Sequence, residues 1–226
     1  KLMKENGYLR SVVPTVNGGT GHGLTDLVLA QYEIGRGDGS TAVSVGMHHM
    51  IVGAEIEART WPDELRQQLF AEIAQDGVLI NSIASEPDLG SPRGGGRPST
   101  ALRKNGNGQW LLNGRKTWST MAPGLSYAIV YVAIEDGSGD TARILQKMDS
   151  RGVAIEETWD SMSMRSTGSH DIVFTDVVVE ETRFLFRTNL NSPSGDAVPG
   201  AAWFPLLLSS ANLGIAHAAR DFVIDF

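Results

Sequence analysis

The stretch "PDELRQQLFAEIAQDGVLINSIA", residues 62–84, changes its hydrophobic period near its middle. Its first part predicts a helix with Pro62 in the first turn and Gly77 at the end. Four apolar residues recur there at helical spacing: Leu65, Leu69, Phe70 and Ile73. From about residue 78 the period is two, as in a β-strand. This switch predicts a boundary between a helical domain, residues 1–76, and a β domain that begins at residue 77.

Two further helices are predicted upstream of the switch. In "GLTDLVLAQYEIGRG", residues 23–37, apolar side chains lie close to one helical face and Gly35 and Gly37 provide a stop. The next segment, residues 38–58, is rich in small and apolar residues and predicts a tightly packed second helix. We therefore expect an N-terminal helical domain that is incomplete at its start.

The pattern over residues 77–187 predicts short strands separated by turn residues. The runs are 78–84, 109–114, 115–120, 127–134, 141–148, 152–157 and 170–179. Asn113-Gly114 falls between two of them and predicts a tight hairpin turn, because both central positions of such a turn need φ > 0. Six or seven short strands without an intervening helix predict a small antiparallel β-barrel or sandwich.

Residues 188–226 complete the predicted α+β multidomain fold. The polar connector "TNLNSPSGDAVPG", residues 188–200, leads to an apolar helical pattern over 203–226 that suits a helix buried in a bundle. The pattern reaches Phe226 without a capping signal, and the chain has no initiating Met. We expect a linker and the first helix of a C-terminal helical domain, within a longer protein.

Composition excludes several classes of function. A formal net charge of -7 argues against a protein that binds the phosphate backbone of nucleic acids. No apolar run reaches membrane-spanning length. Because the chain has no cysteine, disulfides, thiolate nucleophiles and Cys-ligated zinc are impossible, and a cytoplasmic location is expected.

Two segments suggest a ligand. "NSIASEPDLGSPRGGGRP", residues 81–98, is by composition a solvated loop, yet Ser85, Gly90 and Ser91 offer hydroxyls and unhindered N–H groups to a pyrophosphate. In "NGRKTWST", residues 113–120, Trp118, Ser119 and Thr120 place an aromatic surface beside two hydroxyls. That suits a planar, polar-edged ligand such as an isoalloxazine ring, although a strand Trp is more often a core residue.

Other polar residues favour structural interpretations. His48 and His49 point about 100° apart on a helix and do not easily share a metal ion, so no metal site is predicted. One packed and one hydrogen-bonded histidine is the simpler interpretation, with His48 near a pocket as a general base as the alternative. Arg165 with Asp160 and Asp171 predicts an ion-pair set at the edge of the sheet domain.

Four motifs in order resemble the acyl-CoA dehydrogenase superfamily of flavoproteins. The first is "RGDGSTAVSVGMH", which resembles the helical segment before the family's middle domain. "SEPDLGS" resembles the family motif T-E-P-x-A-G-S, and "NGRKTWST" resembles N-G-x-K-x-W-I-T. The fourth, "SMRSTGSHDIVFTDVVV", resembles the family's M-R-G-S-x-T/S-x-x-V-x-F-x-D-V-x-V signature. The resemblance covers about residues 7–226. It implies a helical domain, a middle β-barrel and a C-terminal helical domain, commonly in a homotetramer.

The resemblance also implies a site. FAD would lie between the barrel and the C-terminal domain, with Ser85 and Thr120 on the edge of the ring, Trp118 against its face, and Ser119 beside them. Gly90 and Ser91 would meet the pyrophosphate. The implied reaction is α,β-desaturation of an acyl-CoA thioester, as in fatty acid metabolism, with an electron-transfer partner. The carboxylate base would lie beyond Phe226, so no catalytic residue is assigned.

Desaturation is the leading hypothesis, and one departure from the family pattern supports a second reaction as the alternative. Pro205 stands about where dehydrogenases of the superfamily carry an Arg. This stretch, "WDSMSMRSTGS" and His48 also resemble the superfamily's two-component flavin monooxygenases, which take reduced FMN from a flavin reductase and oxidise small aromatic compounds. There His48 would line the substrate pocket. A non-catalytic binding or assembly subunit, without flavin, is the alternative from another class.

Overall fold

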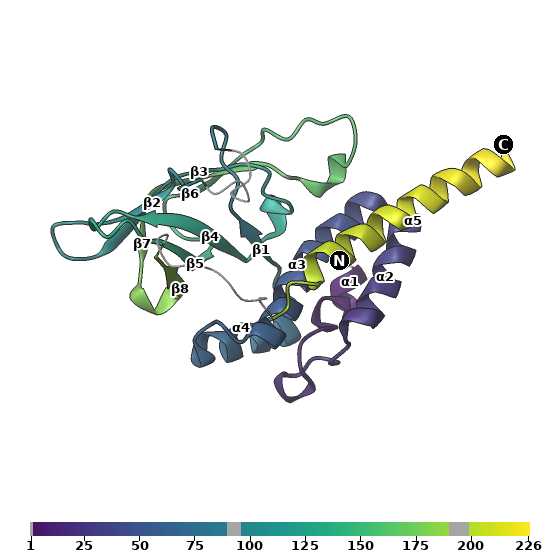
Figure 1. Ribbon diagram of the computed structural model, residues 1–226, viewed down its shortest axis with the longest axis horizontal. Coiled ribbons are helices and arrows are strands. Elements are labelled where there is room, and N and C mark those ends of the chain that lie inside the picture. Colours follow the sequence, from purple (N-terminus) through teal and green to yellow (C-terminus); the bar gives the residue numbers. More distant parts are fainter. Residues whose placement is uncertain (1, 90–95, 190–198) are drawn as a thin grey trace.

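A computed structural model describes residues 2–89, 96–189 and 199–226. Helices and sheet lie side by side, with α3 and β1 at their junction (Figure 1). Within these ranges the α-helices are α1 (Leu2–Glu5), α2 (Leu24–Gly37), α3 (Gly39–Ala58), α4 (Asp63–Asp76) and α5 (Trp203–Asp225). The three helices expected before residue 77 and the one expected after residue 200 are all present. α4 ends at Gly77, whose φ is 60°, as the capping pattern predicts.

Helix α5 packs closely against α2 and α3 because small residues line the contacts. A Cβ atom added to Gly214 would lie 2.2 Å from the Tyr32 carbonyl oxygen, and one added to Gly35 would lie 2.4 Å from that of Ala211. At the α3 contact, Gly53 leaves room for the indole of Trp203. These contacts bring the start of α5 to the junction with the sheet (Figure 1).

The described part of the chain forms one eight-stranded sheet in the order β6-β7-β3-β2-β4-β5-β8, with β1 also paired to β4. The strands are β1 (Ile80–Ile83), β2 (Ala101–Lys104), β3 (Trp110–Lys116), β4 (Tyr127–Ile134), β5 (Thr141–Lys147), β6 (Val153–Glu156), β7 (Asp171–Val179) and β8 (Phe184–Thr188). Most pairings are antiparallel, as expected, but β4 pairs in parallel with both β1 and β2. β1 and β2 thus both pair with β4, β1 with its first half and β2 with its last residues.

The prediction of a hairpin turn at Asn113-Gly114 is wrong. Both residues lie inside β3, at a register shift against β7, and the Asn113 side chain exchanges hydrogen bonds with Asp176. Gly114 has φ 141° and faces Thr100 so closely that an added Cβ would lie 2.6 Å from its Cα. The pair forms a bulge, and the hairpin turn lies between β2 and β3 at residues 105–109.

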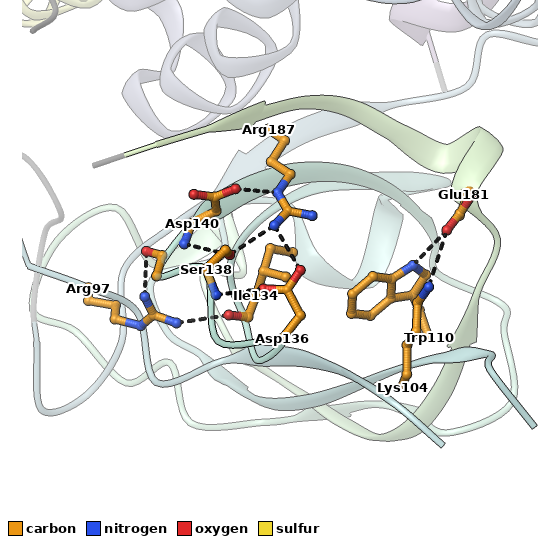
Figure 2. A network of polar contacts seen from close by, with 10 residues as sticks. Arg97, Lys104, Trp110, Ile134, Asp136, Ser138, Asp140, Glu181 and Arg187 are labelled. Atoms are coloured by element: carbon orange, nitrogen blue, oxygen red, sulfur yellow. Dashed lines mark hydrogen bonds and ion pairs between the residues drawn. The ribbon is translucent and has the colours of Figure 1, made fainter. Parts of the chain in front are cut away.

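Side-chain hydrogen bonds hold the loops at the far end of the sheet (Figure 2). Arg187 of β8 binds Asp136 and Asp140 in the β4–β5 turn at 2.8 and 2.5 Å. Arg97 donates to the carbonyl oxygens of Gly139 and Ile134 at 2.6 and 3.0 Å. The chain that returns to β2 is therefore tied to the β4–β5 turn.

Candidate functional site

The chain turns sharply after β3 and presents an aromatic ring to solvent. Trp118 has φ 56° and Met121 has φ 66°, a left-handed conformation that is strained for bulky residues. The Trp118 side chain is 66% exposed and meets Trp159 edge to face, with ring centroids 5.0 Å apart. The strand predicted over 115–120 is therefore wrong at Trp118, because β3 ends at Lys116 and Trp118 lies in the turn beyond it. Backbone strain of this kind clusters at active sites and ligand-binding sites.

Neighbouring segments hold this turn from two sides. The Thr117 N–H donates to the Ser85 carbonyl oxygen at 3.0 Å, and the Asn81 amide donates to the Thr120 carbonyl oxygen at 2.9 Å. On the other side, the Thr117 hydroxyl donates to the Asp171 carboxylate at 2.7 Å. The structure thus brings Ser85 next to the Trp118 turn, although more than thirty residues separate them in the sequence.

A buried ion pair lies beneath the turn. Lys116 Nζ donates to Glu86 Oε1 at 2.7 Å, and their side chains are 0% and 2% exposed. Glu86 also accepts from the N–H groups of Ser99 and Thr100, at 2.7 and 2.9 Å. Lys116 further donates to the Ala84 carbonyl oxygen at 3.3 Å. Because β3, the Ser85 segment and the return to β2 meet at this pair, it fixes the Ser85 backbone relative to Trp118.

The predicted ligand residues have different environments. Ser85 is half-buried and its hydroxyl has no hydrogen-bond partner within the described ranges, while the Thr120 hydroxyl is 3.1 Å from that of Ser169. Ser119 is fully buried and its hydroxyl has no partner among the residues described. It is therefore enclosed rather than exposed beside Trp118, and its N–H donates to the His170 carbonyl oxygen at 3.2 Å. Gly90 and Ser91 lie outside the described residues.

His48 is packed into the interior of the helical domain. Its Nε2 contacts the Leu9 carbonyl oxygen at 2.8 Å, and its Nδ1 accepts from the Ile80 N–H at 3.3 Å. Burial lowers its pKa to about 4, so the ring is neutral near pH 7. Because both ring nitrogens are bonded to backbone, the geometry favours a structural role. His49 is also buried, and neither of its ring nitrogens has a hydrogen-bond partner among the described residues.

The predicted ion-pair set at the sheet edge is only partly correct. Arg165 pairs with Asp160 at 3.0 Å, but Asp171 pairs with Arg115 at 2.7 Å. The reason is strand register: Arg115 lies on β3 opposite the start of β7. Asp171 thereby joins β7 to β3 and to Thr117, so it supports the turn that carries Trp118.

Two cavities flank the junction of α3 and β1. One, of about 750 Å³, is lined by Ser85, by apolar side chains of α3 and by Arg143 of β5. The other, of about 790 Å³, is lined by Thr41 and Ser44 of α3 and by Met121, which follows Thr120. His48 lines neither cavity. Sequence reasoning missed Arg143, since nothing in the run "TARILQKM" indicates that an inward-facing cation lines a cavity.

The described residues contain no cluster of three histidine or acidic side chains placed to hold a metal ion. No helix among them is both long and apolar enough to span a membrane. The arrangement instead fits a planar organic ligand: an open indole face, the Ser85 and Thr120 hydroxyls nearby, and cavities beside them. The fold defines a protein with a helical domain and a sheet domain, and the candidate site and its cavities lie near their junction.

The chain belongs to the acyl-CoA dehydrogenase superfamily. Sequence models of the acyl-CoA dehydrogenase N-terminal and middle domains match residues 1–80 and 82–177. The chain is 38% identical over 225 residues, 99% of its length and 57% of the relative, to YdbM, a candidate acyl-CoA dehydrogenase of Bacillus subtilis (strain 168). It is 29% identical over 230 residues, 97% of its length and 52% of the relative, to the amino sugar nitrososynthase RubN8 of Streptomyces rubradiris. It spans about half the length of these relatives.

Solved structures agree on the fold. KijD3 in complex with dTDP is 26% identical with a TM-score of 0.85, over 99% of this chain and 56% of that one. A second KijD3 structure, which contains FMN and a dTDP-linked amino keto sugar, is 25% identical with a TM-score of 0.82, over 99% of this chain and 55% of that one.

Proposed function

We propose that this chain forms one wall of a flavin site in a flavin-dependent oxidoreductase. The observation that carries the proposal is the exposed Trp118 indole, held in a strained turn beside Ser85 and Thr120. Trp118 packs against the face of the flavin ring, while the two hydroxyls bond its polar edge. Gly90 and Ser91 follow Ser85 in the sequence and bind phosphate. Either FAD or FMN suits this wall.

Of the reactions open to such a protein, we favour oxygen transfer by a monooxygenase. When bound and reduced, the flavin would supply the two electrons with which one oxygen atom of O₂ is transferred to a nitrogen or sulfur atom and the other is reduced to water. The first turn of α5 supports this choice, since Pro205 stands about where the dehydrogenases carry an Arg. The likeness to amino sugar nitrososynthases supports it as well. The reduced flavin would come from a separate reductase.

Acyl-CoA dehydrogenation is the second candidate. The relative with 38% identity is named for this activity, and it supports the candidate. The carboxylate base would then come from a part of the protein outside this chain, with FAD as the cofactor. Both candidates bind flavin against the same Trp118 wall. Flavin binding therefore does not distinguish them, and only the reaction that the protein catalyses does.

Replacing Trp118 tests the flavin wall. Trp118→Gly removes the ring and relieves the left-handed strain, so the fold keeps or gains stability while flavin binding weakens roughly tenfold. Trp118→Phe keeps an aromatic face and should retain most of the affinity. Flavin absorbance after gel filtration and the midpoint of thermal unfolding are the two measurements. Unchanged flavin binding in Trp118→Gly would refute the site.

Two reactions with the flavin-loaded, full-length protein separate the candidates. Anaerobic addition of acyl-CoA bleaches the flavin of a dehydrogenase, because the thioester reduces it directly. A monooxygenase stays oxidised with acyl-CoA, and consumes O₂ with an amine or sulfur substrate only when a reductase supplies reduced flavin. Rapid bleaching by an acyl-CoA would overturn the preference for oxygen transfer.

A further inference from the structure

The cavity of about 750 Å³ has a mostly apolar wall with one basic side chain. Met50, Ile51 and Ala54 of α3 contribute to the apolar wall, together with Phe204 of α5. Arg143 of β5 faces these residues, and Ser82 and Ser85 lie at the end of β1. Because Ser85 also belongs to the candidate flavin site, the cavity adjoins that site.

Among the residues that the structure describes, Arg143 has no negatively charged partner. Its Nη1 donates to the Ser82 hydroxyl at 3.2 Å, and its guanidinium lies 5.0 Å from the Tyr131 ring centroid and 6.0 Å from that of Phe186. No carboxylate within the described ranges forms an ion pair with it. Burial lowers the pKa of Arg143, although the group stays charged near pH 7. A half-buried guanidinium bonded to one hydroxyl retains unused donors.

The other charges around the cavity are already compensated. Glu55 lines the opposite wall, but its carboxylate accepts from Thr60 and Trp61 and pairs with Arg66. Lys116, whose Nζ lies 5.9 Å from the Tyr131 ring centroid, is paired with Glu86. Among the described lining residues, Arg143 therefore carries the uncompensated charge.

We propose that Arg143 binds an anionic group, a phosphate or carboxylate, on the substrate that enters this cavity. Arg143 and Ser82 hold the anion, while the side chains of α3 and Phe204 pack against the apolar part of the same molecule. Guanidinium groups bind such oxyanions with two parallel hydrogen bonds. As a statement about the substrate, the inference rests on the proposed function; the anion site itself can be measured without flavin.

Calorimetric titration of the full-length protein with inorganic pyrophosphate, and separately with succinate, tests the site. Arg143→Met should weaken binding of at least one of these anions roughly 10- to 100-fold, and Arg143→Lys should restore part of the loss. Arg103→Met is the matched control, because Arg103 is 60% exposed and pairs with Asp176 away from the cavity. The inference fails if wild-type protein binds neither anion, or if Arg143→Met binds both as wild type does.

Flavin content, measured on the same samples, separates the two proposals. Anion binding that depends on Arg143 in protein that never takes up flavin would support this site and refute the proposed function. If the protein is loaded with flavin but Arg143→Met binds both anions as tightly as wild type, the anion site is refuted and the proposed function still stands.

Discussion

Glu86 and Lys116 show how a single buried contact stabilises the candidate site. Burial by itself would raise the pKa of Glu86, but hydrogen bonds from Lys116, Ser99 and Thr100 outweigh it and hold the pKa at about 2. Burial lowers the pKa of Lys116 to about 8, against the opposing effect of Glu86. Both groups are therefore charged near pH 7, and each compensates the other's charge in a buried site.

Loss of one partner should be costly. Lys116→Met leaves the Glu86 carboxylate buried and unpaired, so we expect a loss of about 3–5 kcal/mol in unfolding free energy. The double variant Lys116→Met, Glu86→Gln removes both charges and should recover part of that loss. Urea denaturation measures both. Equal stability of Lys116→Met and wild type would contradict the buried pair.

The same pair predicts a dependence on pH. The pKa of Glu86 is lower in the folded chain, about 2, than its ordinary value of 4.5. Its contribution to stability is therefore complete above about pH 4.5 and declines as the pH falls toward 2. Glu86→Gln should flatten this acid decline in urea-denaturation midpoints measured across that range. An equally steep decline in the variant would assign it to other carboxyl groups.

At the scale of elements, glycines set the distance between α5 and α2. Gly214→Ala would place a Cβ 2.2 Å from the Tyr32 carbonyl oxygen, which is backbone and cannot rotate away. We expect a loss of about 1–3 kcal/mol and a lower unfolding midpoint. Gly37→Ala is the control, because nothing lies within 4 Å of its added Cβ, and it should leave the midpoint unchanged. Equal effects of the two changes would argue against the close packing.

Elements also show which sequence patterns were sufficient. The helices over 24–37, 39–58 and 63–76 follow from periodicity and capping by near neighbours, and they are where the sequence predicts them. The local Asn-Gly pattern at residues 113–114 predicts a hairpin turn. The bulge found there depends instead on contacts with Asp176 and Thr100, which are distant in sequence and which the local pattern cannot indicate. The short strand β2 was missed because its four residues carry too little pattern.

For the whole molecule, the proposed flavin site predicts stabilisation by ligand. Flavin that binds the folded chain and not the unfolded one, at about 100 times its Kd, should add about 2.7 kcal/mol to the unfolding free energy. Thermal unfolding of the full-length protein with FAD or FMN measures this shift and ranks the two cofactors. An unchanged midpoint with both would favour the alternative of a non-catalytic subunit.

By itself, the sequence determined the helices before residue 77, the switch to strands and four motifs in the order of the acyl-CoA dehydrogenase superfamily. Those features depend on residues close together in the chain. Only the tertiary structure decided that Ser85 lies beside Trp118 while Ser119 is enclosed, that Lys116 neutralises Glu86, and that Arg143 lines a cavity. Such contacts join distant segments, and they depend on strand register and helix packing, which local periodicity does not specify.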